Sequence, residues 1–186
     1  MPRAAIGSIA IMFTVAFGYG STAIVRSNFA AEEAQPTLRA GPSEGTEIAV
    51  LMFVSTTCAV SRNPDFPDEW RALVDGIAGS VGDQFTRVAT IGVVDARSVP
   101  EGVEFLNEFG GFDEISVGRA NAGMMRYFVA DHPGTLATPQ VVVVRRHFER
   151  GPDGALIITS EEVMSRLVGL GAISNAGRRL DLATAL

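Results

Sequence analysis

The feature that most constrains the fold is a continuous apolar run at residues 48–54, which has strand length and no polar face. A strand of this kind is buried on both faces, as in parallel sheets that helices cover on each side. Residues 87–95 contain a second apolar strand, and residues 141–144 are consecutive valines, which favour strands strongly. The sequence therefore predicts an α/β fold in which a mixed sheet is flanked by helices.

Helices are expected between these strands. Apolar residues from Trp70 to Val81 have helical spacing and form a stripe that faces a core. Pro100 opens a short helix that Gly110 closes, and residues 116–130 are predicted to form a weaker helix. Strands that alternate with helices in this way predict helices on both faces of the sheet.

A hairpin and a further helix complete the predicted domain. Residues 151–154 (GPDG) form a turn, and residues 155–159 return as the partner of the valine strand. Ser160 is then predicted to cap a final helix, with Glu161 and Glu162 in its first turn. The predicted order is β-α-β-α-α-β-β-α, and leucines near the end of the chain predict one more short helix.

The N-terminal segment is predicted to be a membrane anchor. Residues 4–25 carry no charge and are bracketed by Arg3 and Arg26, and about 20 apolar residues suffice to span a bilayer as a helix. A cleaved signal peptide is the alternative, because residues 21–23 (STA) form a tolerable cleavage site. The apolar run continues beyond that site, which favours a retained anchor.

This pattern divides the chain into an N-terminal transmembrane anchor (1–29), a linker (30–46), a folded domain (47–170) and a C-terminal tail (171–186). The linker has no apolar period and is punctuated by Pro and Gly. We expect a single-pass protein of the bacterial inner membrane, oriented by its anchor with the globular domain in the periplasm. Its expected partners are the lipid bilayer and the subunits of an integral membrane protein complex.

Charge and cysteine content exclude two classes of function. The net charge of −6 disfavours nucleic acid as a partner, because its binding needs a concentrated basic surface. Cys58 is the single cysteine, so no internal disulfide can form and two-thiol redox chemistry has no resolving thiol. The sequence predicts no cofactor and no metal site.

Two short motifs resemble the thioredoxin-like superfamily, and the resemblance covers about residues 47–170. The segment FVSTTCAVS resembles the strand, CxxC motif and helix of that family, with Cys58 at the first cysteine and Ser61 at the second. The segment ATPQV matches the place where the family has a cis-proline beside the reactive thiol, which implies that role for Pro139. The resemblance implies a thioredoxin-like mixed sheet.

The wide separation of Cys58 and Pro139, with the anchor, linker and domain layout, is similar to that of the membrane-anchored, exported thioredoxin-like proteins of cytochrome c maturation. Three departures make the site degenerate. Family enzymes resolve the mixed disulfide with a second cysteine, but Ser61 stands there. Met52 replaces the buried carboxylate of thioredoxin, and Thr57 replaces the aromatic residue before the nucleophile.

Three functions remain open. Loss of the catalytic groups favours a non-catalytic accessory subunit of a membrane complex of respiratory or photosynthetic type. The alternative is a monothiol thiol-disulfide oxidoreductase or isomerase of exported proteins, in which Cys58 lies at a helix N-terminus with a lowered pKa. The third is a copper site of Cys58, His132 and His147, although copper-delivering relatives pair two cysteines with a histidine. We predict the accessory role, so the sequence leans against an enzyme.

Overall fold

The computed structural model describes residues 42–118, 122–129 and 137–179. Its elements are β1 (Gly45–Ser55), α2 (Phe66–Ser80), β2 (Arg87–Asp95), α3 (Val99–Asn107), β3 (Glu114–Val117), α4 (Ala122–Val129), β4 (Gln140–Arg150), β5 (Leu156–Val168) and α5 (Leu170–Arg179). The predicted anchor (1–29) and most of the predicted linker lie outside the described residues. Within the described part of the chain, every helix is too short or too polar to cross a membrane.

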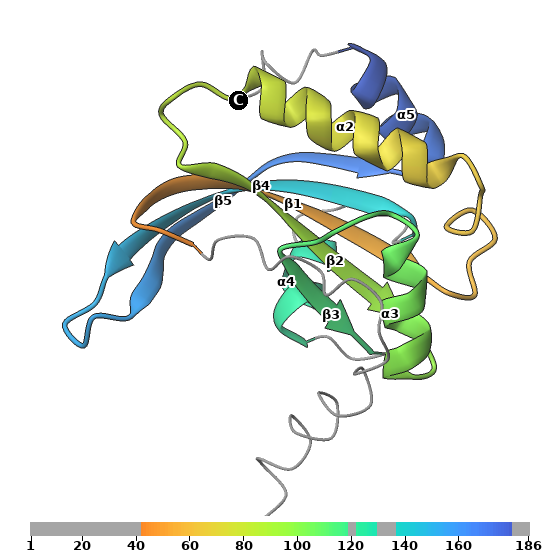
Figure 1. The fold of residues 1–186 in the computed structure, drawn as a ribbon, viewed down its shortest axis with the longest axis horizontal. Helices are drawn as coiled ribbons and strands as arrows, with labels where there is room; N and C mark the ends of the chain where they lie inside the picture. The colour runs from red at the N-terminus through yellow and green to blue at the C-terminus, as the bar shows by residue number, and fades with distance from the viewer. Residues whose placement is uncertain (1–41, 119–121, 130–136, 180–186) are drawn as a thin grey trace, which may run out of the picture. The chain divides into compact units, whose positions relative to one another are not determined.

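The strands form one mixed five-stranded sheet in the order β3-β2-β1-β4-β5. β1 is parallel to β2, and β2 is parallel to β3, whereas β4 is antiparallel to both β1 and β5. The central strand β1 therefore has a parallel neighbour on one side and an antiparallel neighbour on the other. This sheet, with helices on both faces, fits an α/β thioredoxin-like fold (Figure 1).

Adjacent residues of β1 face two different cores, so the strand is buried on both faces as its sequence predicts. Ile48 and Met52 face the larger core, to which α2, α3 and α5 contribute. Leu51 and Phe53 face a smaller core that α4 covers. Figure 1 shows α2 and α5 side by side on one face of the sheet and α4 on the other. The predicted flanking of the sheet by helices is confirmed.

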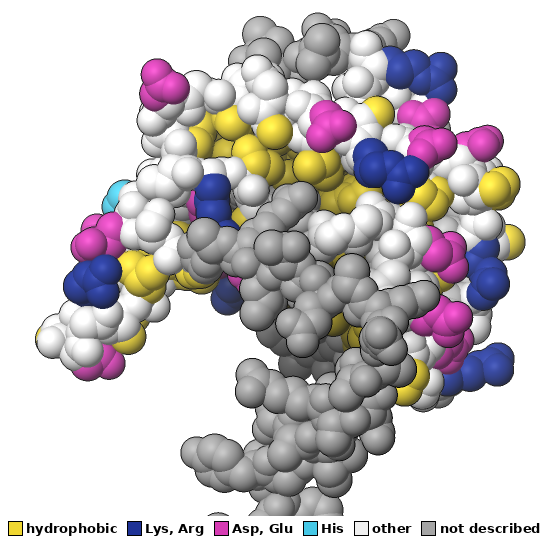
Figure 2. Space-filling view, in the orientation of Figure 1, with side chains coloured by type: hydrophobic (Ala, Val, Ile, Leu, Met, Phe, Trp, Pro, Cys, Tyr) yellow, Lys and Arg dark blue, Asp and Glu magenta, His cyan; other side chains and the backbone are white. Residues whose placement is uncertain are grey.

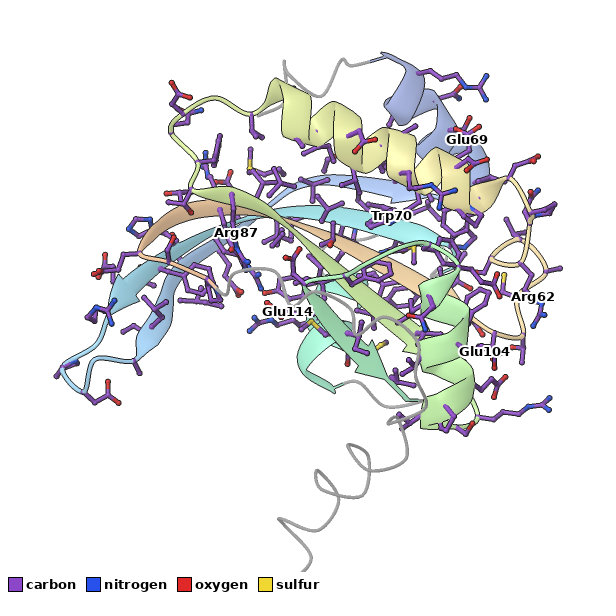
Figure 3. The ribbon with its side chains drawn as sticks, viewed as in Figure 1. Arg62, Glu69, Trp70, Arg87, Glu104 and Glu114 are labelled. Atoms are coloured by element: carbon purple, nitrogen blue, oxygen red, sulfur yellow. The ribbon has the colours of Figure 1, made fainter. Side chains whose placement is uncertain are left out.

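The helices predicted after β1 and after β2 both form, with small shifts at their ends. In α2, Trp70, Leu73 and Ile77 are buried, as their helical spacing predicts. Trp70 also stacks on Phe112, with ring centroids 5.6 Å apart (Figure 3). The helix α3 begins with a cap, because the Ser98 hydroxyl accepts a hydrogen bond from a backbone amide in its first turn.

The prediction of a single helix over residues 116–130 is wrong at its start. Residues 114–117 form the short strand β3, which pairs with β2, and the helix α4 begins only at Ala122. The strand packs closely against α3, because a Cβ atom at Gly102 would collide with Val117. Four residues carry too little periodicity to identify a strand, so the sheet and α3 determine this conformation rather than the local sequence.

The predicted helix that begins at Ser160 is also wrong, because the chain continues as the strand β5 to Val168. The acidic residues that suggested a first helical turn lie opposite basic residues of β4, with Glu161 facing Arg146 and Glu162 facing Arg145. Arg145 and Glu162 form an ion pair across the two strands. No helix forms over residues 160–168. The helix α5 follows only after Gly169, whose φ is +81°, in the segment predicted as the C-terminal tail.

The final helix α5 occupies the segment in which a tail was expected. Ile173 is fully buried in the larger core, and Gly177 lies against the backbone of Leu73 in α2. The packed fold therefore extends to Arg179. The short helix predicted from Leu180, Leu182 and Leu186 lies outside the described residues.

A buried ion pair lies at the end of β1 that is remote from Cys58. Glu47 and Arg146 are 1% and 4% exposed, and the Arg146 Nε lies 2.7 Å from a Glu47 carboxylate oxygen. Arg87 donates to the other Glu47 oxygen at 2.8 Å, and Arg146 also approaches Glu114 at 3.5 Å. The strand register puts these groups on one face of the sheet, where Figure 3 labels Arg87 and Glu114.

Candidate functional site

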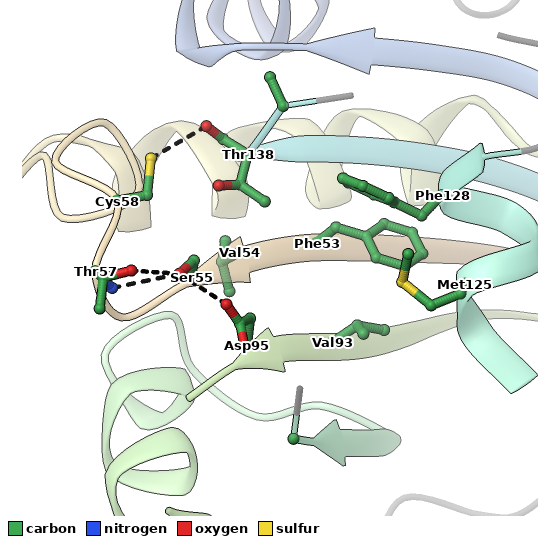
Figure 4. A pocket seen from close by; sticks show the side chains of 12 residues that line it. Phe53, Val54, Ser55, Thr57, Cys58, Val93, Asp95, Met125, Phe128 and Thr138 are labelled. Carbon is green, nitrogen blue, oxygen red and sulfur yellow. Dashed lines mark hydrogen bonds between the residues drawn. The ribbon is translucent and has the colours of Figure 1, made fainter. Parts of the chain in front are cut away.

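A pocket opens where the parallel strands β1 and β2 end, and its volume is about 510 Å³. Open α/β sheets bind their ligands outside the carboxyl ends of parallel strands, so this is the expected edge for a site. Its walls come from both strand ends, from the turn after β1, from α4 and from the segment before β4. The lining residues are Phe53, Val54, Ser55, Thr57, Cys58, Val93, Asp95, Gly118, Met125, Phe128, Ala137 and Thr138 (Figure 4).

Cys58 lies in a series of tight turns and not at the start of a helix. Its backbone amide donates to the carbonyl oxygen of Ser55 at 3.1 Å, and the amide of Arg62 donates to the carbonyl oxygen of Cys58 at 3.1 Å. The helix α2 begins only at Phe66, which Pro67 follows in the first turn. The predicted placement of Cys58 at a helix N-terminus is therefore wrong, so the helix dipole is not what acts on the thiol.

The thiol lies beside the segment that carries Pro139. The Cys58 Sγ donates a hydrogen bond to the carbonyl oxygen of Thr138 at 3.2 Å, and the Thr138–Pro139 peptide bond is cis. The Cys58 side chain is partly exposed. Figure 4 shows Cys58 and Thr138 together at one end of the pocket. The structure thus brings together a thiol and a cis-proline segment that are far apart in the sequence.

Hydrogen bonds act on this thiol in both directions. The bond that Cys58 donates to the Thr138 carbonyl oxygen is made only by the neutral thiol, whereas the bonds that the sulfur accepts favour the thiolate. Burial raises the pKa of Cys58, but it is outweighed by hydrogen bonds from the side chain of Thr138 and from the backbone and hydroxyl of Ser61. The backbone of Val60 adds a weaker contribution, and the net result is a pKa below the ordinary value of a thiol. A partly exposed thiol with a lowered pKa has the properties of a nucleophile.

Ser61 and Met52 stand at the positions where the thioredoxin resemblance leads one to expect a second cysteine and a buried carboxylate. Ser61 is 1% exposed and lies under the end of β1, where the Ser55 amide approaches its hydroxyl at 3.5 Å. A hydroxyl at that position cannot form a disulfide with Cys58, although it can donate a hydrogen bond to the sulfur. Met52 is fully buried in the larger core, so it supplies no proton acceptor.

Sequence reasoning missed the polar groups at the strand ends. The Ser55 hydroxyl lies 3.0 Å from the Thr57 hydroxyl and 3.5 Å from the carboxylate of Asp95 (Figure 4). Asp95 is exposed at the end of β2. Asp95 is the last residue of a predicted parallel strand that neighbours the strand before Cys58. Ligands bind at the carboxyl ends of such strands, so this position could have identified Asp95.

The apolar end of the pocket was also missed. Phe53 of β1 and Phe128 of α4 lie with ring centroids 5.3 Å apart, and Met125 of α4 is 36% exposed beside them. Figure 4 shows these three side chains at the end of the pocket that is away from Cys58. The helical spacing of Met125 and Phe128 predicts that both face inward, but it does not show that they meet Phe53 beside the pocket.

Cys58 and His147 of the suggested copper site do not come together. The Thr46–His147 pair lies at one end of the β1–β4 ladder and the Phe53–Gln140 pair, next to the Cys58 turn, lies at the other. His147 is bonded to the Thr46 hydroxyl at 2.9 Å, and His132 lies outside the described residues. In the described ranges, no three His, Cys, Asp or Glu side chains are grouped so that they could hold a metal ion.

Comparisons with known proteins give only weak likenesses. No protein-family model and no curated protein matches the chain. A secreted Mycobacterium tuberculosis disulfide oxidoreductase, homologous to E. coli DsbE, is 17% identical over 75% of this chain and 81% of its own, with a TM-score of 0.37. A thiol:disulfide interchange protein from Bacteroides sp. is 10% identical over 73% of this chain and 74% of its own, with a TM-score of 0.39. The description of the fold as thioredoxin-like depends on the order and direction of the strands in the sheet.

Proposed function

We propose that this chain is a monothiol thioredoxin-like protein that forms mixed disulfides through Cys58. The observation that carries the proposal is the environment of the thiol: partly exposed, at the mouth of a pocket, with Thr138 and Ser61 hydrogen-bonded to it. Among the groups that the thioredoxin resemblance finds missing, the second cysteine is the one that releases the partner. The groups that activate the attacking sulfur are present.

The proposed step is a thiol-disulfide exchange. The Cys58 thiolate attacks one sulfur of a partner disulfide, a new bond forms between Cys58 and that sulfur, and the other partner sulfur leaves as a thiolate. The Cys58 sulfur is oxidised, and the leaving sulfur is reduced. Because Ser61 has no thiol, a second thiol from outside this chain must attack the adduct to release Cys58. The chain therefore holds a partner until another protein or small thiol releases it.

Alkylation of the folded protein across pH tests this proposal. Iodoacetamide should modify Cys58 at a rate that rises with pH around a midpoint lower than that of the same chain unfolded in urea. Cys58→Ser is the matched control, because it removes the only thiol with little change in volume. A thiol that reacts only after unfolding would remove the monothiol function.

The accessory role predicted from the sequence remains a second candidate, and one surface favours it. β5 is an edge strand of the sheet, and Ile157 and Ile158 near its start are 48% and 41% exposed. Figure 2 shows apolar side chains on the projecting hairpin at the left of the view. An exposed apolar edge strand can add a strand from a partner subunit. Purification in mild detergent should then yield a complex that the double variant Ile157→Asp, Ile158→Asp loses.

The membrane setting is part of this proposal and depends on the sequence of residues 1–29. We propose that this segment anchors the chain in the bacterial inner membrane and leaves the domain in the periplasm, where disulfides persist. Digestion of spheroplasts with protease tests it. The domain should be degraded in intact spheroplasts, whereas a domain on the cytoplasmic side would survive until the membrane is lysed.

A further inference from the structure

We propose that the pocket beside Cys58 selects disulfides that carry an uncharged aromatic group next to the reacting sulfur. This inference rests on the proposed monothiol function and adds the class of partner. Cys58 lies at one end of the pocket, and the aromatic and thioether side chains of Phe53, Phe128 and Met125 lie at the other. A disulfide bound at Cys58 would place a neighbouring group over those side chains.

The chemistry of the far end suits an aromatic ring better than a polar group. Phe53 is 3% exposed and supports the tilted ring of Phe128, so Phe128 and Met125 supply the surface that a ligand can reach. A ligand ring would gain from edge-to-face and offset contacts with Phe128 beyond the burial of its area. The Met125 thioether adapts to the shape of a ligand and makes favourable contacts with ring edges. The volume of about 510 Å³ lies in the range, roughly 300–1,000 Å³, of pockets that hold small organic groups.

The wall that carries Phe128 and Met125 is fixed to the sheet. Arg166 of β5 donates to the backbone carbonyl oxygens of Tyr127 and Phe128 at 2.6 and 3.0 Å. The Gln140 side chain donates to the same Phe128 oxygen at 3.3 Å. These bonds occupy carbonyl groups at the C-terminal end of α4, which would otherwise lack helical partners. The wall is therefore preorganised, and a ligand need not order it.

The polar groups of the pocket are confined to the end near Cys58. Among the described residues that line it, Asp95 is the one charged side chain, and Ser55 and Thr57 supply the neighbouring hydroxyls. A carboxylate at the mouth disfavours anionic partners and leaves uncharged ones unaffected. The apolar far end would have to desolvate any charged group without a partner for it.

Two matched peptide disulfides test the selection. One is the symmetrical disulfide of the dipeptide Phe-Cys, blocked at both ends, and the other is that of Gly-Cys. Their leaving thiols are alike, so a difference in rate reports the neighbouring side chain. The wild-type chain should form its mixed disulfide with the Phe-Cys dimer about tenfold faster, because burial of most of a phenyl group is worth that factor. Mass spectrometry of quenched samples gives both rates.

Two variants locate the effect in the pocket. Met125→Glu puts a charge on the apolar wall and should remove most of the preference, which is measured as the ratio of the Phe-Cys rate to the Gly-Cys rate of the same variant. Val99→Glu is the matched control, since Val99 is 47% exposed in the first turn of α3 and does not line the pocket. It should keep the preference. If Met125→Glu does not fold, the wild-type rates with the Phe-Cys and Gly-Cys dimers still decide whether the chain prefers an aromatic neighbour.

A second arm compares phenethyl and hydroxyethyl methanethiosulfonate, which share one leaving group. An aromatic preference with these reagents indicates that the partner is a low-molecular-weight disulfide. A preference with the peptides alone indicates that the partner is a polypeptide disulfide. Equal rates within both pairs would overturn the proposed selection and leave the monothiol function standing. Failure of folded Cys58 to react with any of the reagents would instead overturn the monothiol function.

Discussion

Cys58 donates its thiol hydrogen to the carbonyl oxygen of Thr138, with 3.2 Å between sulfur and oxygen. The contact joins the turn after β1 to the segment that enters β4, and these two strands are neighbours in the sheet. The thiol is thus hydrogen-bonded to the segment before β4, which is antiparallel to β1. Its pocket lies at the ends of β1 and β2, which are parallel to each other. The environment of Cys58 therefore depends on the sheet as a whole and not on a local motif.

Ser61→Ala should raise the pKa of Cys58, because it removes the hydroxyl hydrogen bond that favours the thiolate. The midpoint of iodoacetamide alkylation should move to higher pH, towards that of the unfolded chain. Ser160→Ala, at an exposed position of β5, is the control and should leave the midpoint unchanged. An unshifted midpoint in folded Ser61→Ala would show that the hydroxyl does not act on the sulfur.

Ser61→Cys should give the chain the dithiol chemistry that it lacks. The new thiol would occupy the buried position three residues after Cys58, in the same series of turns, so a disulfide between the two positions should form on mild oxidation. Titration of free thiols before and after oxidation should show the loss of both. Insulin reduction should appear in this variant and be absent in wild type, and a wild type that reduces insulin catalytically would contradict the requirement for a second thiol.

Strongly patterned segments made much of the fold predictable. Residues 48–54 and 141–144 are apolar on both faces of their strands, and α2 has a clear helical stripe, so each local signal agrees with the final structure. The strand β3 has only four residues, and residues 160–162 of β5 carry a polar sequence that also suits a helix start. In both places the pairing with a neighbouring strand decides the conformation, which a single segment does not reveal.

The candidate site was predictable only where a motif marks it. Cys58 and Pro139 follow from the resemblance to thioredoxin-like proteins, whereas Asp95 and Phe128 belong to no short motif. Asp95 needs the order of strands in the sheet, and Phe128 needs the packing of α4 on Phe53. Both are properties of three-dimensional arrangement that depend on residues distant in the sequence.

Ile173→Ala should show that α5 belongs to the packed domain and is not a tail. Ile173 is fully buried against the larger core, so its truncation leaves a cavity and should lower the free energy of unfolding by about 3 kcal/mol. Urea denaturation followed by Trp70 fluorescence measures the loss. Asn175→Ala, at an exposed position of the same helix, should change the stability by less than about 0.5 kcal/mol. Equal effects of the two variants would place α5 outside the cooperative unit.

Tyr127 should make the stability of the domain sensitive to alkaline pH. Burial raises the pKa of its phenol, and the hydrogen bond to Glu161 raises it further, against a smaller opposing effect of Arg126. Because the folded pKa is above the unfolded one, the associated stability is complete below the unfolded pKa. It is lost as the pH rises through the folded value.

Phenolate absorbance and urea denaturation across alkaline pH test this behaviour. Tyr127 should ionise at a higher pH in the folded chain than in the unfolded chain, and stability should fall over that interval. Tyr127→Phe isolates its signal, because the chain has only two tyrosines, and should flatten the pH dependence of stability in the same interval. An unchanged slope would show that the phenol titrates alike in both states.

Arg146→Met should be strongly destabilising, because it leaves the buried Glu47 carboxylate with one basic partner in place of two. The pair is almost fully buried, and removal of one member of such a pair costs about 3 kcal/mol. Arg145→Met is a closely matched control one residue away. Its ion pair with Glu162 is exposed, so its loss should cost less than about 1 kcal/mol.

The double variant Glu47→Gln, Arg146→Met tests whether the loss of stability in Arg146→Met comes from the buried Glu47 carboxylate that has lost a basic partner. Neutralising Glu47 should recover a substantial part of the stability, because the amide needs less compensation for its burial than the carboxylate does. Urea denaturation of the four chains gives the coupling free energy between the two positions. If the double variant is as unstable as the sum of the single variants, the pair acts through packing of the arginine stem over Phe148, whose ring centroid lies 5.5 Å from the guanidinium carbon.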